Sequence, residues 1–140
     1  MSGELASLSW NVRGLRRREK VRSTYKVISG CKASIVLIQE SKLGPEKQRS
    51  IRRLCGKNKW SFVSSPTVRT TGGLISMWDT NSFRVEKEIV LDRLIGIFGS
   101  LGSANFGVGI LNVYAPNAQG ERREFFRIVK HLIDQKGSRF

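Results

Sequence analysis

The sequence lacks several features that would assign it to common classes of protein. No apolar run approaches the roughly 20 residues that a membrane-spanning helix needs. The first four residues have neither the basic start nor the apolar stretch of a signal peptide. There are only two cysteines, Cys31 and Cys55, and their spacing fits neither a metal-ligand motif nor a disulfide framework. We therefore expect a soluble, intracellular chain with reduced, partly buried thiols and no membrane contact.

Acidic residues are also scarce, and the basic residues are unevenly distributed. The 140 residues include 25 lysines and arginines and 11 aspartates and glutamates, a formal net charge of +14. Residues 1–70 hold 16 basic and 4 acidic side chains, whereas residues 71–140 hold 9 and 7. A basic face on one part of a domain is typical of proteins that bind polyanions, most often nucleic acid. A basic surface kept for solubility is the alternative that charge alone leaves open.

The composition, 39% hydrophobic and 9% aromatic, is that of a globular chain long enough for one domain. Alternating or continuous apolar patterns predict strands over 5–11, 34–40, 60–64, 74–78, 83–91, 94–101 and 106–114. Helical spacing predicts helices over 18–32, 45–55 and 120–135. The 34–40 run resembles a strand buried on both faces of a parallel sheet. Early βαβ units followed by hairpins indicate one α/β domain of sandwich type.

The last predicted helix has an apolar side, and its residues are Phe125, Ile128, Val129, Leu132 and Ile133. The one histidine of the sequence, His131, falls on the same helix. We interpret it as a residue of the helix surface or of the edge of the core, without a role in a site.

Three predicted strands end on polar residues that suit metal-assisted phosphodiester chemistry. The first ends at Asn11, the second at Glu40, and a later strand runs into Tyr114 and Asn117. Sheets in α/β proteins bind ligands at the carboxyl ends of their strands. A carboxylate there can bind Mg²⁺, and amide or phenol groups can contact phosphate. Taken singly, each signal has an ordinary explanation, such as a solvated glutamate or a turn.

In this order, the segments resemble those of the endonuclease/exonuclease/phosphatase superfamily, which includes apurinic endonucleases and deoxyribonuclease I. They are similar in particular to the N-terminal endonuclease domain of plant LINE-type (non-LTR) retrotransposon polyproteins. The resemblance is carried by Leu8-Ser-Trp-Asn-Val-Arg-Gly-Leu15, Ile35-Val-Leu-Ile-Gln-Glu-Ser-Lys42, Gly72-Gly-Leu-Ile-Ser-Met-Trp-Asp79 and Leu111-Asn-Val-Tyr-Ala-Pro-Asn117. It implies that residues 5–140 form the N-terminal part of a two-sheet α/β sandwich, incomplete because the chain covers about the first half to two-thirds of such a domain.

The resemblance also implies roles for the polar residues at the strand ends. Glu40 would be the principal ligand of a Mg²⁺ cofactor, and Asn11 would lie beside the metal and help to hold the hydrated ion and the phosphate. Tyr114 would contact the scissile phosphate, and Asn117 would help to shape the same site. The family's reaction is in-line attack of an activated water on a DNA phosphodiester, with the metal neutralising developing charge. This implies DNA as the partner, no small-molecule cofactor, and a nuclear location, with the cytoplasm as the alternative.

Four arginines in the loop after the first strand, Arg13, Arg16, Arg17 and Arg18, are candidates for contacts with a DNA backbone. Basic side chains at the N-terminus of a helix interact unfavourably with the helix dipole, which favours a bound partner. The alternative is an exposed, basic helix start with no partner.

Two motifs that the family requires do not occur in this sequence. Gly-Asp-x-Asn would orient the nucleophile, and Ser-Asp-His would complete the metal and phosphate site. Three hypotheses follow: an inactive fragment of a retrotransposon endonuclease, an active nuclease or phosphatase with a reduced site, or a basic nucleic-acid-binding module without catalysis. Because catalytic groups that act as a unit are each worth orders of magnitude in rate, we expect the chain alone to be inactive.

Overall fold

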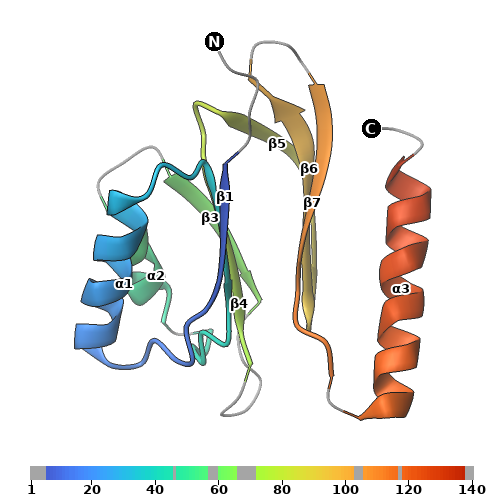
Figure 1. Cartoon of the computed structure of the whole chain (residues 1–140), viewed down its shortest axis with the longest axis horizontal. Coiled ribbons are helices and arrows are strands. Elements are labelled where there is room, and N and C mark those ends of the chain that lie inside the picture. The colour runs from blue at the N-terminus through green and yellow to red at the C-terminus, as the bar shows by residue number, and fades with distance from the viewer. Residues whose placement is uncertain are drawn as a thin grey trace.

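The computed structural model describes residues 6–45, 47–56, 60–65, 72–102, 106–116 and 118–137. Its elements form four layers in the order helices, sheet, sheet, helix (Figure 1). In chain order they are β1 (Ser7–Asn11), α1 (Arg18–Gly30), β2 (Ile35–Gln39), α2 (Gln48–Cys55), β3 (Trp60–Ser65), β4 (Leu74–Asp79), β5 (Phe83–Leu91), β6 (Leu94–Leu101), β7 (Phe106–Val113) and α3 (Gln119–Gly137). The predicted two-sheet α/β sandwich is confirmed, and each element lies within a few residues of its predicted bounds.

The first sheet has the strand order β1-β2-β4-β3. Its strands β1 and β2 are parallel and are joined by α1, whereas β4 is antiparallel to both β2 and β3. The prediction that β2 belongs to a parallel sheet therefore holds only on its β1 side. An apolar run shows that both faces of a strand are covered, but it does not show in which direction the neighbouring strands run.

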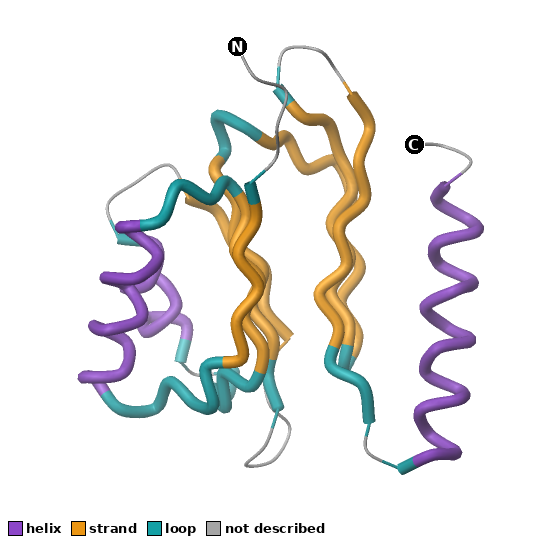
Figure 2. The backbone as a smooth tube through the Cα atoms, in the orientation of Figure 1, coloured by secondary structure: helices purple, strands orange, loops and turns teal. Residues whose placement is uncertain are grey.

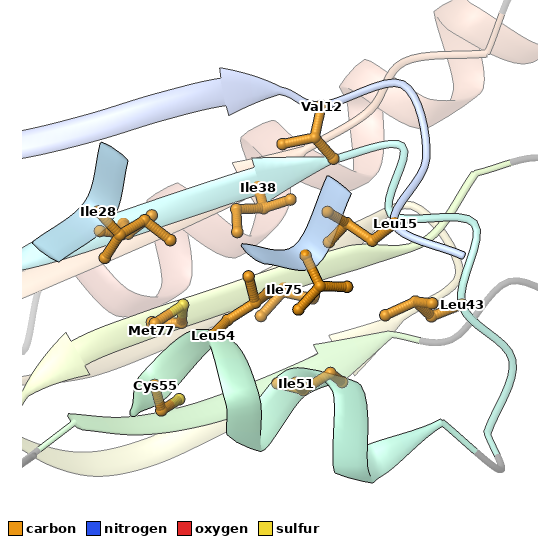
Figure 3. Packing of buried hydrophobic residues seen from close by; sticks show 12 residues of the cluster. Val12, Leu15, Ile28, Ile38, Leu43, Ile51, Leu54, Cys55, Ile75 and Met77 are labelled. Atoms are coloured by element: carbon orange, nitrogen blue, oxygen red, sulfur yellow. The ribbon is translucent and has the colours of Figure 1, made fainter. Parts of the chain in front are cut away.

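Helices α1 and α2 cover the outer face of the first sheet (Figure 1). Ile28 of α1 and Leu54 of α2 pack with Ile38 of β2 and with Ile75 and Met77 of β4 in one cluster (Figure 3). All five side chains are 2% exposed or less. Full burial of side chains of this size stabilises a fold by about 1.5–3 kcal/mol each, before the loss of chain entropy is counted. This cluster is the main core of the first layer.

Both cysteines lie in or beside this core. They are free, with Cys31 half-buried and Cys55 buried, which confirms the predicted partly buried thiols. Burial raises the pKa of the Cys55 thiol to about 11, and the positive charge of Arg52 opposes that rise. Cys55 is therefore held as a neutral thiol and behaves as a small apolar side chain.

The second sheet is an antiparallel meander of β5, β6 and β7. Its inner face carries Ile95 and Ile97, which pack with Phe83 and with Leu74 and Trp78 of the first sheet in a second buried cluster. This cluster holds the two sheets together face to face. Helix α3 lies on the outer side of the second sheet (Figure 1).

The predicted apolar side of α3 is only partly covered in the structure. Phe125, Val129 and Leu132 are half-buried, whereas Ile128 and Ile133 are 41% and 53% exposed. The half-buried residues follow the spacing of four and then three, which defines one narrow stripe of a helix. Ile128 and Ile133 fall outside that stripe. Within the described ranges, no helix is long and apolar enough to cross a membrane.

Candidate functional site

The carboxyl ends of β1, β2 and β7 lie at the same end of the two sheets. Figure 2 shows the loops that follow these strands gathered at the lower edge of the view. In the first sheet, β1 and β2 are parallel with Asn11 opposite Gln39, so that Glu40 follows directly beside the end of β1. The topology thus brings together polar residues that are about 30 and about 100 positions apart in the sequence, because strands of one direction end at one edge.

Asn11 and Glu40 are in direct contact. The side-chain amide nitrogen of Asn11 donates a hydrogen bond to Oε2 of Glu40. The Oδ1 atom of Asn11 accepts a hydrogen bond from the backbone N–H of Arg13 at 3.2 Å. An ionised carboxylate can only accept hydrogen bonds, so the amide nitrogen of Asn11 acts as the donor. The amide oxygen of Asn11 is bound to the backbone N–H of Arg13 in the following loop. Asn11 therefore orients the Glu40 carboxylate and leaves its other oxygen available to a cation.

The backbone beside this pair adopts an uncommon conformation. Arg13, Glu40 and Lys42 have φ angles of +57°, +55° and +57°. Residues other than glycine rarely adopt positive φ, and such strain is concentrated at functional sites, where surrounding structure maintains it. Three such residues within the two loops that carry Asn11 and Glu40 therefore mark this end of the sheet as the candidate site.

Backbone hydrogen bonds continue beyond the strand ends and hold these loops in place. The N–H of Gly14 donates to the carbonyl of Glu40 at 2.7 Å, and the N–H of Ser41 donates to the carbonyl of Gly73 at 3.1 Å. Gly73 has a φ of +93°, and a Cβ atom at that position would lie 2.3 Å from Oγ of Ser41. Only glycine lets the chain that enters β4 approach the loop after Glu40 so closely.

A polar groove of about 370 Å³ opens between the two sheets next to this pair. It is lined by Ser9 and Asn11 of β1, Leu37 and Gln39 of β2, and the segment Leu111 to Ala115 in and after β7. Glu40 is not among the lining residues, so Asn11 is the residue that connects the carboxylate to the groove.

Asn112 links the two sheets at the base of the groove. It is 1% exposed, and its Nδ2 atom donates to the carbonyl oxygens of Ile38 at 3.2 Å and Ile75 at 3.0 Å. Its Oδ1 atom accepts a hydrogen bond from Nε2 of Gln39 at 2.9 Å. A buried amide with its hydrogen bonds satisfied fixes one arrangement of the groups around it. The sequence reasoning gave neither Gln39 nor Asn112 a role, although each is a polar residue at the end of an apolar strand.

Tyr114 lies half-buried at the β7 side of the groove. Its ring centroid is 5.8 Å from Cζ of Arg93, and its backbone N–H donates to the Arg93 carbonyl at 3.0 Å. A guanidinium at this distance attracts the face of the ring and holds a positive charge near the groove. Sequence reasoning missed Arg93, because it comes from the turn between β5 and β6 and reaches Tyr114 only through the pairing of β6 with β7.

The structure brings together three of the predicted catalytic and metal-binding residues. Asn11 contacts Glu40, and Asn11 and Tyr114 line the same groove. The fourth residue, Asn117, lies outside the described residues. His131 is exposed on α3, as expected for a residue of the helix surface.

The four predicted DNA-contacting arginines are all exposed. Arg13 follows Asn11 in the loop, and Arg16 is tied back by a hydrogen bond from its Nε to the carbonyl of Lys42 at 3.0 Å. Arg17 is the N-cap of α1 and makes no capping hydrogen bond with its side chain. Arg18, the first residue of α1, lines a different pocket on the helical layer.

The described residues contain no group of three or more histidine, cysteine, aspartate or glutamate side chains placed to hold a metal ion. Glu40 is the carboxylate that contacts Asn11. One protein carboxylate is enough for Mg²⁺, because this ion binds through one or two carboxylates and keeps several of its waters. The oxygen donors present thus fit a hydrated Mg²⁺ ion.

The sequence matches no family model and no curated protein. The structure is similar to solved enzymes of the endonuclease/exonuclease/phosphatase type. The match to the AP endonuclease LMAP from Leishmania major has a TM-score of 0.64 at 20% identity, covering 88% of this chain and 44% of that one. For D. rerio TDP2 complexed with single-strand DNA product the TM-score is 0.68 at 15% identity, covering 93% and 54%. For the human Nocturnin catalytic domain with bound sulfate it is 0.70 at 12% identity, covering 98% and 61%.

These similarities show that the chain has the fold of the endonuclease/exonuclease/phosphatase enzymes. The chain spans about half the length of the solved structures that it matches. Similarity of fold at this level of identity does not establish a reaction, which has to be argued from the site itself.

Proposed function

We propose that this chain carries the Glu40 half of a Mg²⁺-dependent site that hydrolyses DNA phosphodiesters, and that it derives from a LINE-type retrotransposon endonuclease. The contact between Asn11 and Glu40, at the ends of adjacent parallel strands, carries this proposal. The positive φ of Glu40 supports it, as does the groove that joins Asn11 to Tyr114. Among the neighbours in fold, the D. rerio TDP2 structure holds a single-strand DNA product.

Each residue has a role that follows from its position. Glu40 binds the metal through its carboxylate, and Asn11 holds that carboxylate in one orientation. Tyr114 donates its phenolic O–H to a phosphate oxygen, and the nearby positive charge of Arg93 attracts the same phosphate. When bound, Mg²⁺ supplies positive charge that neutralises the charge developing on the phosphate.

The groups that would activate the attacking water are not among these residues. We therefore propose that the chain binds metal and DNA but does not cleave DNA by itself, because catalytic groups that work as a unit lose nearly all activity when part of the unit is missing. This can be tested by nicking of supercoiled plasmid in Mg²⁺ and in EDTA. We expect the same low nicking in both. Nicking that requires Mg²⁺ and is abolished by Glu40→Gln would instead show an active reduced site.

Metal binding tests the assignment of Glu40 without relying on activity. Titration with Mn²⁺ is expected to broaden the amide NMR signals of Asn11, Arg13 and Ser41, which adjoin the carboxylate. Glu40→Gln preserves the shape of the side chain and removes its charge, so the broadening should disappear. Glu88→Gln, on the exposed face of β5, removes the same charge elsewhere and should leave the broadening intact. Broadening that persists in Glu40→Gln would refute Glu40 as the ligand.

A second candidate function, nucleic-acid binding without any catalysis, is favoured by charge. Residues 1–70 carry 16 basic and 4 acidic side chains, and seven of the basic residues lie in α1 and α2. Backbone contacts made by lysine and arginine give an affinity that falls steeply with salt. DNA binding that depends on salt, that is the same in Mg²⁺ and in EDTA for the wild-type chain, and that is unchanged in Glu40→Gln would favour this function over the first.

A further inference from the structure

A second pocket lies on the helical layer, apart from the polar groove between the sheets. It has a volume of about 280 Å³ and is lined by Arg18, Val21, Arg22 and Tyr25 of α1 and by Arg53 of α2. Helices α1 and α2 lie side by side on the outer face of the first sheet (Figure 1). None of these residues lines the groove that contains Asn11 and Tyr114, so the two concave sites are distinct.

Three arginines from two helices converge on this pocket without an acidic partner. Arg18, Arg22 and Arg53 are all exposed, and no described residue forms a hydrogen bond or an ion pair with their side chains. The only acidic residue of the two helices is Glu19, which does not line the pocket. Like charges gathered in one place repel each other, and a bound anion removes that cost. Arginine is well suited to the task, because its planar fork binds phosphate oxygens in pairs.

Tyr25 forms part of the pocket wall, and its ring lies directly beside Gly56. The φ of Gly56 is +68°, and a Cβ atom there would lie 2.8 Å from Cε1 and 3.2 Å from Oη of Tyr25. The absence of a side chain at Gly56 therefore leaves the space that the half-buried ring occupies. No described residue accepts a hydrogen bond from the phenol. The hydroxyl is thus free to donate to an oxygen atom of a ligand.

We propose that this pocket binds a phosphate group of a nucleic-acid backbone, with Arg22 and Arg53 clamping it from the two helices. The surroundings indicate a polyanion rather than a free phosphate ion. Beyond the pocket, α1 and α2 also present the basic residues Lys20, Lys26, Arg49 and Arg52. A chain of phosphates can contact such an extended basic surface at several points, which a single small anion cannot do.

This site goes beyond the proposed hydrolysis and does not depend on it. A nucleic acid held at α1 and α2 is bound on the side of the first sheet that faces away from the second sheet (Figure 1). The pocket would add binding energy from a part of the nucleic acid that does not react. Binding measured in EDTA therefore excludes any contribution of a metal bound at Glu40, and substitutions in the pocket then test the pocket itself.

The test compares two double variants of the full chain that have the same net charge. Arg22→Gln/Arg53→Gln removes the clamp, and Arg84→Gln/Lys87→Gln removes two exposed charges of β5, which belongs to neither of the two helices. Binding of a fluorescent oligonucleotide is measured by anisotropy over a range of salt concentrations. We expect the clamp variant to bind about tenfold more weakly and to lose about one unit or more of salt slope, and the control variant to change less than about threefold.

Two further measurements decide how a loss of binding is interpreted. Tyr25→Phe removes only the hydroxyl and is expected to weaken binding by less than the clamp variant does. Near-UV circular dichroism should be unchanged in all variants, because the substituted arginines are exposed. Equal losses in the two double variants would overturn the proposal, since they would show that only total charge matters. Competition by inorganic phosphate at low millimolar concentration would overturn the assignment to nucleic acid in favour of a free phosphate ion.

Discussion

The two layers of the molecule differ in how completely they bury their apolar side chains. The first layer consists of the β1-β2-β4-β3 sheet with α1 and α2, and the second of the β5-β6-β7 sheet with α3. Among the described residues, only Val27 of the first layer is a large hydrophobic side chain left exposed. The second layer exposes six such side chains, which are Val90, Leu91, Val113, Phe126, Ile128 and Ile133.

The difference shows that stability and function are distributed differently over the molecule. Burial of apolar surface is the dominant favourable term in folding, so the first layer supplies most of the stability. The candidate site nevertheless needs both layers. Asn11 and Glu40 belong to the first, whereas Tyr114 and Arg93 come from the second. Asn112 and the second buried cluster connect the two layers and thereby determine the geometry of the site.

The largest effect is expected from a cavity in the first layer. Ile75 is 0% exposed and belongs to the main cluster between the first sheet and helices α1 and α2. Ile75→Ala should lower the free energy of unfolding by about 2–5 kcal/mol, because it removes apolar contacts and leaves a void. Urea unfolding followed by circular dichroism measures this change. A loss below about 1 kcal/mol would contradict the assignment of stability to the first layer.

A smaller effect is expected from cutting the polar link between the layers. Asn112→Ala leaves the carbonyl oxygens of Ile38 and Ile75 without this donor and Gln39 without this acceptor. Each buried polar group that loses its partner lowers the stability by about 1–3 kcal/mol, and by less where water can reach it. We expect a loss of stability in this range by thermal unfolding, together with changed NMR shifts at Tyr114. If the Tyr114 signals were unchanged in this variant, Asn112 would not determine the geometry of the groove.

The burial of Cys55 in the first layer also predicts that the stability of the fold decreases at alkaline pH. Burial raises the pKa of Cys55 to about 11 from the reference value of 9.0, so the folded state keeps the thiol proton more tightly than the unfolded state. This contribution is fully present below about pH 9 and is lost as the pH rises from about 9 to about 11. Urea midpoints at increasing pH should fall more steeply for the wild-type chain than for Cys55→Val. Parallel curves would show that Cys55 ionises without opening the layer.

The smallest effect is expected in the second layer. Ile133 is 53% exposed on α3, so Ile133→Ala should change the free energy of unfolding by no more than about 0.5 kcal/mol. It is the matched control for Ile75→Ala, since both remove the same atoms from isoleucine. The same urea unfolding experiment applies. A loss comparable to that of Ile75→Ala would abolish the contrast between the layers.

Local patterns predicted nearly all of the elements correctly, since the spacing of apolar residues along the chain reflects the repeat of a helix or a strand. The resemblance to the endonuclease/exonuclease/phosphatase superfamily implied that Asn11 and Glu40 lie at one site, and the two side chains are in contact. Two parallel strands joined by one helix place their carboxyl ends side by side, so a short segment of sequence was enough. The antiparallel position of β4 beside β2 was not predictable in the same way, because β2 would be equally apolar with any neighbour.

By itself, the sequence determined the type and order of the elements, the basic character of the first half, and the Asn11–Glu40 pair. Only the tertiary structure decided that Asn112 joins Gln39 across the two sheets, that Arg93 lies over Tyr114, and that Arg53 meets Arg22 on the helical layer. The physical reason is that periodicity encodes the geometry of a chain with its near neighbours. Contacts between separate layers depend on how those layers pack, and no local spacing in the sequence records that packing.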